Sequence, residues 1–101
     1  MRKVYICGKV SGLQRSDVEL KFNNAETLLK FNHYEPVNPI RFVKENTTWD
    51  KAMKICISKL MDCEYIYLLD DFTDSMGAWI EYDLSRRVNI KQLKKEYLCR
   101  I

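Results

Sequence analysis

Short apolar runs alternate with longer segments of helical periodicity along the chain. The runs at 4–7 and 65–69 are rich in β-branched and aromatic residues, which is typical of buried strands. Residues 35–37 can form only a brief strand, because proline lacks the N–H group that a sheet needs. Apolar side chains recur at helical spacing over 16–32 and 48–63. This alternation of strands and helices predicts right-handed crossovers and a parallel sheet.

Capping residues and a third helix complete the predicted elements. The N-cap residues expected for the first two helices are Ser16 or Asp17, and Thr48. A third helix is expected to start within the segment Asp74-Ser75-Met76-Gly77 and to end near Arg87. Beyond it, we expect a short helix over 90–95 and a last strand over 97–101.

The composition is that of one ordinary globular domain. With 101 residues, of which 47% are hydrophobic and 31% charged, the chain can bury one modest core. No apolar run approaches the roughly 18 residues of a membrane span. The apolar stretch near the N-terminus is too short for a secretory signal. We therefore expect a cytoplasmic protein that is not bound to a membrane.

The four cysteines give no sign of a metal site or a disulfide framework. They stand at 7, 56, 63 and 99, without a C-x-x-C pair, and the chain has one histidine. A structural zinc site needs closer pairs of ligands, so we expect reduced thiols and no metal ion or other cofactor.

The charges are distributed unevenly, although the net charge is only +3. Residues 62–85 hold seven acids and no lysine or arginine, whereas residues 86–101 hold six bases against the single acid Glu96. This asymmetry fits either a solvated face with a basic last helix, or a basic tail that helps to bind an anion or a neighbouring protomer. The net charge is too small to predict a nucleic-acid polymer as partner.

Three polar loops follow the three predicted strands. They are 8–12, Asn38-Pro39 and 70–77, and two of them contain glycine. Ligands of open parallel sheets bind outside the carboxyl ends of the strands, where these loops would meet. The sequence therefore predicts a ligand site at this edge.

Two of these loops can hold an anion. Gly8-Lys9-Val10-Ser11-Gly12 offers close backbone approach, free N–H groups, a hydroxyl and a cation, although a plain tight turn fits as well. Asp74 and Ser75 precede a helix, where they either hold an anion or only cap the helix.

Three carboxylates near the same edge are candidate catalytic groups. Glu81 lies four residues after Gly77, which places it on a small-residue helix face where it can serve as a nucleophile or a base. An ordinary surface glutamate is the alternative. Asp70 and Asp71 end the third strand, where they bind a ligand hydroxyl or cap a loop. A Mg²⁺ site from Asp70, Asp71 and Asp74 is a further alternative.

Three sequence blocks together resemble the nucleoside 2-deoxyribosyltransferase-like superfamily. They are Tyr-Ile-Cys-Gly-Lys-Val-Ser-Gly at 5–12, Val-Asn-Pro at 37–39, and Asp-Asp-Phe-Thr-Asp-Ser-Met-Gly-Ala at 70–78 with Glu81. More narrowly, the chain looks like the small uncharacterised domains of that superfamily in bacteria and phages. The resemblance covers residues 1 to about 85.

The resemblance implies a fold, a reaction and a set of residues. The fold is a compact Rossmann-like (flavodoxin-like) three-layer α/β/α arrangement with a mainly parallel four- to five-stranded sheet. Characterised members cleave or exchange the N-glycosidic bond of deoxynucleosides or nucleoside monophosphates. Glu81 matches their nucleophile, and Asp70 or Asp71 matches a carboxylate near the base or sugar. The residues expected to bind the substrate or its phosphate are Tyr5, Gly8, Lys9, Ser11, Gly12, Asn38, Asp74, Ser75 and Gly77.

The departures from the pattern leave other functions open. Met76 stands where the narrower family has an arginine, and the tail beyond residue 85 lacks the usual apolar last strand. The cleft of relatives is often completed by a second subunit, so we expect a homodimer or a higher homo-oligomer. Besides the enzyme, the alternatives are a protein that binds a nucleotide-derived molecule without turnover, and an interaction domain with a vestigial pocket.

Overall fold

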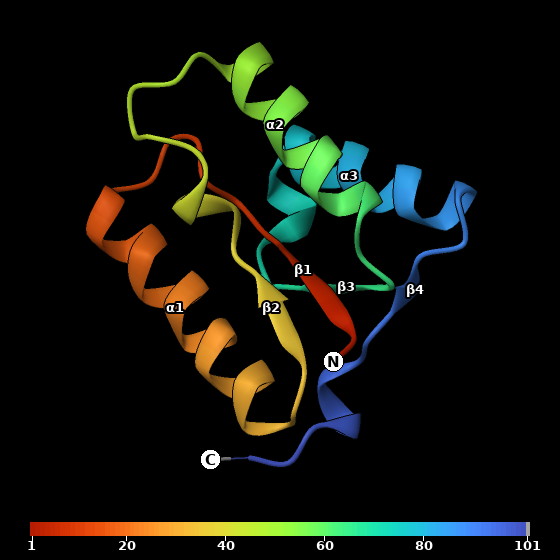
Figure 1. The fold of residues 1–101 in the computed structure, drawn as a ribbon. Coiled ribbons are helices and arrows are strands. Elements are labelled where there is room, and N and C mark those ends of the chain that lie inside the picture. Colours follow the sequence, from red (N-terminus) through yellow and green to blue (C-terminus); the bar gives the residue numbers. More distant parts are fainter. Residues whose placement is uncertain (101) are drawn as a thin grey trace.

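Four parallel strands form one sheet in the order β2-β1-β3-β4 (Figure 1). The computed structural model describes residues 1–100. The strands are β1 (Lys3–Cys7), β2 (Glu35–Val37), β3 (Tyr65–Leu68) and β4 (Lys91–Gln92). The helices are α1 (Arg15–Phe31), α2 (Trp49–Met61) and α3 (Met76–Arg87), with short 3-10 turns η1 (Pro39–Arg41), η2 (Phe72–Asp74) and η3 (Lys95–Tyr97). The predicted Rossmann-like three-layer α/β/α class is confirmed, and the sheet has four strands.

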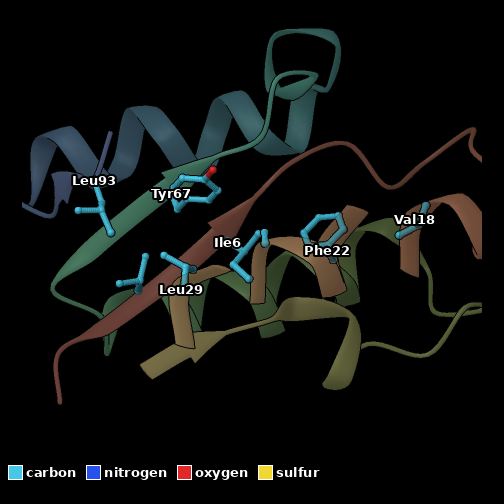
Figure 2. Close-up of a cluster of buried hydrophobic side chains, with 8 residues drawn as sticks. Ile6, Val18, Phe22, Leu29, Tyr67 and Leu93 are labelled. Carbon is cyan, nitrogen blue, oxygen red and sulfur yellow. The ribbon is translucent and has the colours of Figure 1, made fainter. Parts of the chain in front are cut away.

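The two faces of the sheet are covered by different helices. Val4 and Ile6 of β1 pack in one apolar cluster with α1, whereas Tyr5 and Cys7 pack in a second cluster with α2 and α3. This alternation is the two-residue period of a strand that is buried on both sides. Figure 2 shows the first cluster, in which Ile6 lies over α1.

The strand order places a crevice at the carboxyl edge of the sheet. The chain leaves β1 toward β2 through α1, and then returns across β1 to β3 through α2. Right-handed crossovers in opposite directions put α1 and α2 on opposite faces. The loops after β1 and β3 therefore separate at the point where the strand order reverses, which is where open α/β sheets bind ligands.

Of the two predicted helix starts, the first was wrong and the second was confirmed in position. The first helix begins at Arg15 after Gln14, so neither Ser16 nor Asp17 is its N-cap. Thr48 does occupy the N-cap position of α2, but its side chain makes no capping hydrogen bond. The buried face of α1 packs on the sheet, whereas α2 buries Leu60 fully and otherwise packs through half-buried or exposed apolar side chains.

The segment after α3 differs from its prediction. Residues 90–95 do not form a helix, because Lys91 and Leu93 donate backbone hydrogen bonds to carbonyl groups of the chain at β3. An extended chain also lets Ile90 and Leu93 reach opposite apolar clusters. The predicted strand over 97–101 is absent from residues 97–100, and residue 101 lies outside the described residues. Cys99 is instead held by Asn32.

None of the helices within residues 1–100 is long and apolar enough to cross a membrane.

Candidate active site

A cavity of about 330 Å³ opens at the carboxyl edge of the sheet. Its walls come from the loop after β1 with the first turn of α1, from η1 and the segment after it, from α2, and from the start of α3. Six of the predicted site residues line it, namely Gly8, Ser11, Gly12, Ser75, Gly77 and Glu81. The structure thus brings all three predicted loops to one cavity, and the second loop reaches it through Pro39 rather than Asn38.

Glu81 is placed in the cavity by the start of α3. Ser75 is the N-cap of this helix, and its Oγ accepts a hydrogen bond from the Ala78 N–H at 3.1 Å. One turn later, Glu81 lines the cavity although only 6% of its surface is exposed. Asp74 is exposed and belongs to η2, so it does not cap α3. The buried carboxyl group of Glu81 is therefore presented on a locally well-defined helix turn.

Burial makes the Glu81 carboxyl group titrate near neutral pH. Loss of solvent raises its pKa from 4.5 to about 7, and hydrogen bonding from Tyr5 and Cys7 of β1 offsets only part of this effect. The pKa of Tyr5 is raised well above its usual range, by burial and by the nearby Glu81 charge. Tyr5 thus contacts the carboxyl group rather than the open part of the cavity.

Two thiols complete the surroundings of this carboxyl group. Burial raises the pKa of Cys7 far above its usual value, and the Cys7 Sγ lies 3.4 Å from the Ala78 carbonyl oxygen. Burial also raises the pKa of Cys56, which lines the cavity from α2, to about 11. Both thiols are neutral at pH 7, so Glu81 is the member of this cluster that changes charge near neutrality.

Glycines let the neighbouring elements approach the site closely. A Cβ atom on Gly77 would lie 2.9 Å from the Met53 Sδ, so α2 packs directly on the start of α3. A Cβ atom on Gly8 would lie 2.6 Å from the Leu69 Cδ1, at the end of β3. Only a residue without a side chain fits these two contacts undisturbed.

Asp70 and Asp71 do not line the cavity. Asp71 forms an ion pair with Lys21 of α1, and it accepts a hydrogen bond from the Lys9 N–H at 3.0 Å. Burial acts to raise the pKa of Asp71, but these hydrogen bonds outweigh burial and lower it. Asp71 therefore ties the loop after β1 to the end of β3. The Lys9 side chain does not line the cavity either.

Asp70, Asp71 and Asp74, the alternative Mg²⁺ ligands, do not form a metal-binding cluster. Within residues 1–100, no group of three His, Cys, Asp or Glu side chains is arranged to hold a metal ion.

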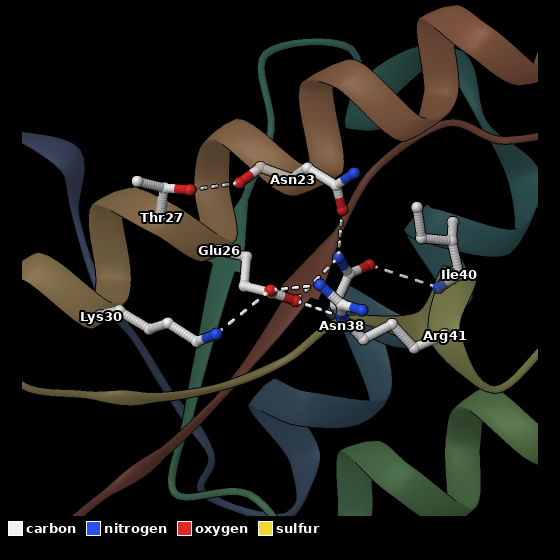
Figure 3. Close-up of polar contacts among 7 residues, drawn as sticks. All are labelled: Asn23, Glu26, Thr27, Lys30, Asn38, Ile40 and Arg41. Carbon is white, nitrogen blue, oxygen red and sulfur yellow. Dashed lines mark hydrogen bonds and ion pairs between the residues drawn. The ribbon is translucent and has the colours of Figure 1, made fainter.

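Asn38 supports the cavity wall from behind instead of lining it. It is 1% exposed, and its Nδ2 donates to Asn23 at 3.2 Å and to Glu26 at 3.1 Å (Figure 3). Its Oδ1 accepts a hydrogen bond from the Ile40 N–H, which caps η1. Every polar atom of the Asn38 side chain is thus used to fix η1 on α1.

Two arginines fasten the same wall to α1. Arg41 donates two hydrogen bonds, of 2.7 and 2.6 Å, to the Glu26 carboxylate. This pairing lowers the pKa of Glu26 to about 2. Arg15 donates to the carbonyl oxygens of Ile40 and Val43 at 3.2 and 3.4 Å. The wall at 39–43 is therefore held in place by α1.

Several lining residues could not be located from the sequence. They are Arg15, Lys44, Glu45, Thr47, Trp49, Met53 and Cys56. The last three carry helical periodicity, which predicts only that α2 has an apolar face. The crossing of α2 over the end of β1 brings them to the cavity, and no local pattern records that crossing. Lys44 makes no hydrogen bond or ion pair through its side chain within residues 1–100, whereas the Arg15 guanidinium is occupied.

The family model for a domain of unknown function, DUF4406, matches residues 2–93. The chain belongs to the DUF4406 family. The DUF4406 match includes the whole sheet and every cavity-lining residue named above. Residues 94–100, which include η3, lie beyond the matched DUF4406 range. A search of curated proteins finds no match to this chain.

Proposed function

We propose that this DUF4406 domain binds a nucleoside or nucleotide and cleaves its N-glycosidic bond, as a hydrolase or a deoxyribosyltransferase. Glu81 carries the proposal, because it is a buried carboxyl group on the floor of a cavity with a pKa of about 7. Gly77 lies on the same helix one turn earlier, and its lack of a side chain lets α2 form the cavity wall close to Glu81. The resemblance of the three loop blocks to nucleoside 2-deoxyribosyltransferase-like proteins supports the same reaction.

The reaction uses the charged form of Glu81. A carboxylate oxygen attacks the anomeric carbon as the bond from that carbon to the base nitrogen breaks, and the base leaves with the bonding electron pair. The base takes a proton from water in this scheme, because Asp70 and Asp71 do not line the cavity. The glycosyl ester is then attacked by water or by the nitrogen of a second base, which releases the Glu81 carboxylate.

The polar part of the cavity suits the 5′ end of the sugar. Ser11 and Ser75 line it with the glycine-bearing loop, and they can donate hydrogen bonds to a hydroxyl or a phosphate. Lys44 is the lining cation whose side chain makes no ion pair within residues 1–100, and it can neutralise a phosphate. We assign this role to Lys44 rather than to Lys9, whose side chain does not line the cavity.

The test is release of free base from a panel of deoxynucleosides and nucleoside monophosphates, followed by chromatography. We expect at least one substrate, and complete loss of release in Glu81→Gln with binding retained. The matched control is Glu64→Gln, because Glu64 is exposed and lies before β3, at the opposite edge of the sheet. Absence of release from every member of the panel would refute the enzyme.

Binding without turnover is the second candidate function. It is favoured by the position of Asp70 and Asp71, because within residues 1–100 no second buried carboxyl group lines the cavity to protonate the leaving base. In that case, a nucleotide would raise the melting temperature of both the wild type and Glu81→Gln, and no base would be released by either.

We further propose a homodimer or higher homo-oligomer. Met76, Trp79 and Ile80 are exposed apolar side chains at neighbouring positions of α3, beside the cavity wall. A second copy that covers this face would shield them and complete the mouth of the cavity. Sedimentation velocity should show a species larger than 12.1 kDa that Ile80→Glu converts to the monomer. A monomeric wild type at high concentration contradicts the proposal.

A further inference from the structure

The two tryptophans of the chain occupy different surroundings although both are about half exposed, at 48% for Trp49 and 45% for Trp79. The Trp79 Nε1 donates to the Thr73 carbonyl oxygen at 3.0 Å, and its ring packs against Phe72 and Tyr82. Trp79 does not line the cavity. The Trp79 ring is thus fixed by contacts within the protein, although about half of its surface is exposed.

Trp49 has none of these attachments within residues 1–100. It is the first residue of α2, it lines the cavity, and its indole N–H donates no hydrogen bond in that range. It also takes part in none of the aromatic pairs formed by the described residues. An indole ring that is half exposed at a cavity and lacks a partner offers both a flat apolar face and a free donor.

The ring is close to the helix turn that carries the reacting group. The Trp49 Nε1 lies 3.5 Å from the position that a Cβ atom of Gly77 would take. Gly77 precedes Glu81 by one turn of α3, and both line the same cavity. A sugar whose anomeric carbon meets Glu81 therefore extends its attached base into space that Trp49 borders.

Resting on the proposed function, we infer that Trp49 is the residue on which the substrate base stacks. Every nucleobase has a π-face, so this contact accepts purines and pyrimidines alike. The loop before α2 also contributes Glu45 to the lining, which provides an acceptor for the edge of the base. The cavity is thereby divided into a sugar end at α3 and a base end at α2.

Tryptophan fluorescence distinguishes the two rings. In Trp79→Phe, Trp49 is the remaining tryptophan, and we expect a saturable change in emission when a deoxynucleoside monophosphate that binds is added. In Trp49→Phe, the remaining Trp79 should show no such change, although calorimetry should still detect binding. A saturable change in emission that is seen in Trp49→Phe but not in Trp79→Phe would overturn the assignment of Trp49 as the stacking residue.

Affinity measurements separate stacking from a packing role of Trp49 in α2. In a Glu81→Gln background, which keeps the substrate intact, Trp49→Leu should weaken the Kd for deoxynucleoside monophosphates by about 5- to 150-fold. The Kd for 2-deoxyribose 5-phosphate, which has no base, should stay unchanged. Trp49→Phe should restore most of the affinity, because phenylalanine also stacks.

The outcomes distinguish failure of the stacking role from failure of the proposed function. Equal affinity of Trp49→Leu and its parent for nucleotides overturns the stacking role and leaves the proposed function intact. An equal loss for the nucleotide and for 2-deoxyribose 5-phosphate shows that Trp49 only supports the fold of α2, which also overturns it. A parent protein that binds no member of the panel overturns both the stacking role and the proposed function.

Discussion

Replacement of Glu81 by glutamine should stabilise the folded chain at neutral and alkaline pH. Burial raises the pKa of this carboxyl group from 4.5 to about 7, so the folded state holds the proton more tightly than the unfolded state does. The favourable contribution of the neutral carboxyl group is complete below pH 4.5 and is lost as the pH rises through about 7. Glutamine stays neutral throughout and does not suffer this loss.

The size of the effect follows from the rise in pKa. A rise from 4.5 to about 7 corresponds to about 3 kcal/mol of unfolding free energy between the two ends of the titration. Glu81 is only 6% exposed, so solvent screens little of this term. Changes in packing and in hydrogen bonds to Tyr5 and Cys7 shift the whole curve of Glu81→Gln, but they do not depend on pH in this range. The diagnostic quantity is therefore the change with pH in the difference between the unfolding free energies of Glu81→Gln and the wild type.

The assay is urea unfolding between pH 4.5 and 8.5, followed by far-ultraviolet circular dichroism. The unfolding free energy of Glu81→Gln relative to that of the wild type should rise by up to about 3 kcal/mol from about pH 4.5 to about pH 8.5. A constant difference would show that the carboxyl group already ionises normally in the folded chain, and would refute the reasoning.

Glu26 provides a control in which the effect of the substitution on stability should depend on pH in the opposite direction. Its hydrogen bonds from Arg41 lower its pKa to about 2, so its stabilising effect is present above pH 4.5 and is lost as the pH falls toward 2. Glu26→Gln should therefore be destabilised at pH 7, and its deficit should shrink in acid. Because the Arg41 side chain is 60% exposed, screening reduces this deficit.

Three further predictions address the site and the tail. If Glu81 is the nucleophile, kcat/KM for base release should rise with pH through about 7, and a fall over that range would exclude this role. Gly8→Ala should lower the unfolding free energy by about 2 kcal/mol, because the added Cβ atom would lie 2.6 Å from Leu69. Gly12→Ala should lower it by about 1 kcal/mol, because Gly12 has a φ of +82° but lies in open space. Equal melting temperatures of the two variants would contradict this difference. Asn32→Ala removes hydrogen bonds of 2.9 and 2.7 Å to the Cys99 backbone, so the Cys99 amide should exchange faster, and unchanged exchange would show that other contacts hold the tail.

The sequence could indicate the first three strands and the start of α3 because their causes are local, whereas β4 was predicted as a helix. An apolar run such as 4–7 is buried on both faces wherever it pairs in a parallel sheet, so its composition alone predicts its place. The cap formed by Ser75 involves residues only three apart. The position of Glu81 one turn beyond Gly77 is likewise a property of the helix. These features are short-range, and short-range patterns are visible in a sequence.

Only the tertiary structure decided which polar residues face the cavity. Asp71 and Lys21 are 50 residues apart, and nothing in either neighbourhood predicts that their ion pair holds the end of β3 to α1. Asn38 follows β2 as predicted, but its partners on α1 turn it into a support for the wall. Trp49 reaches the cavity because α2 crosses the sheet. Partners that are distant in the chain leave no periodic signal, so the sequence by itself determined the architecture and the place of Glu81, whereas long-range packing determined the walls of the cavity.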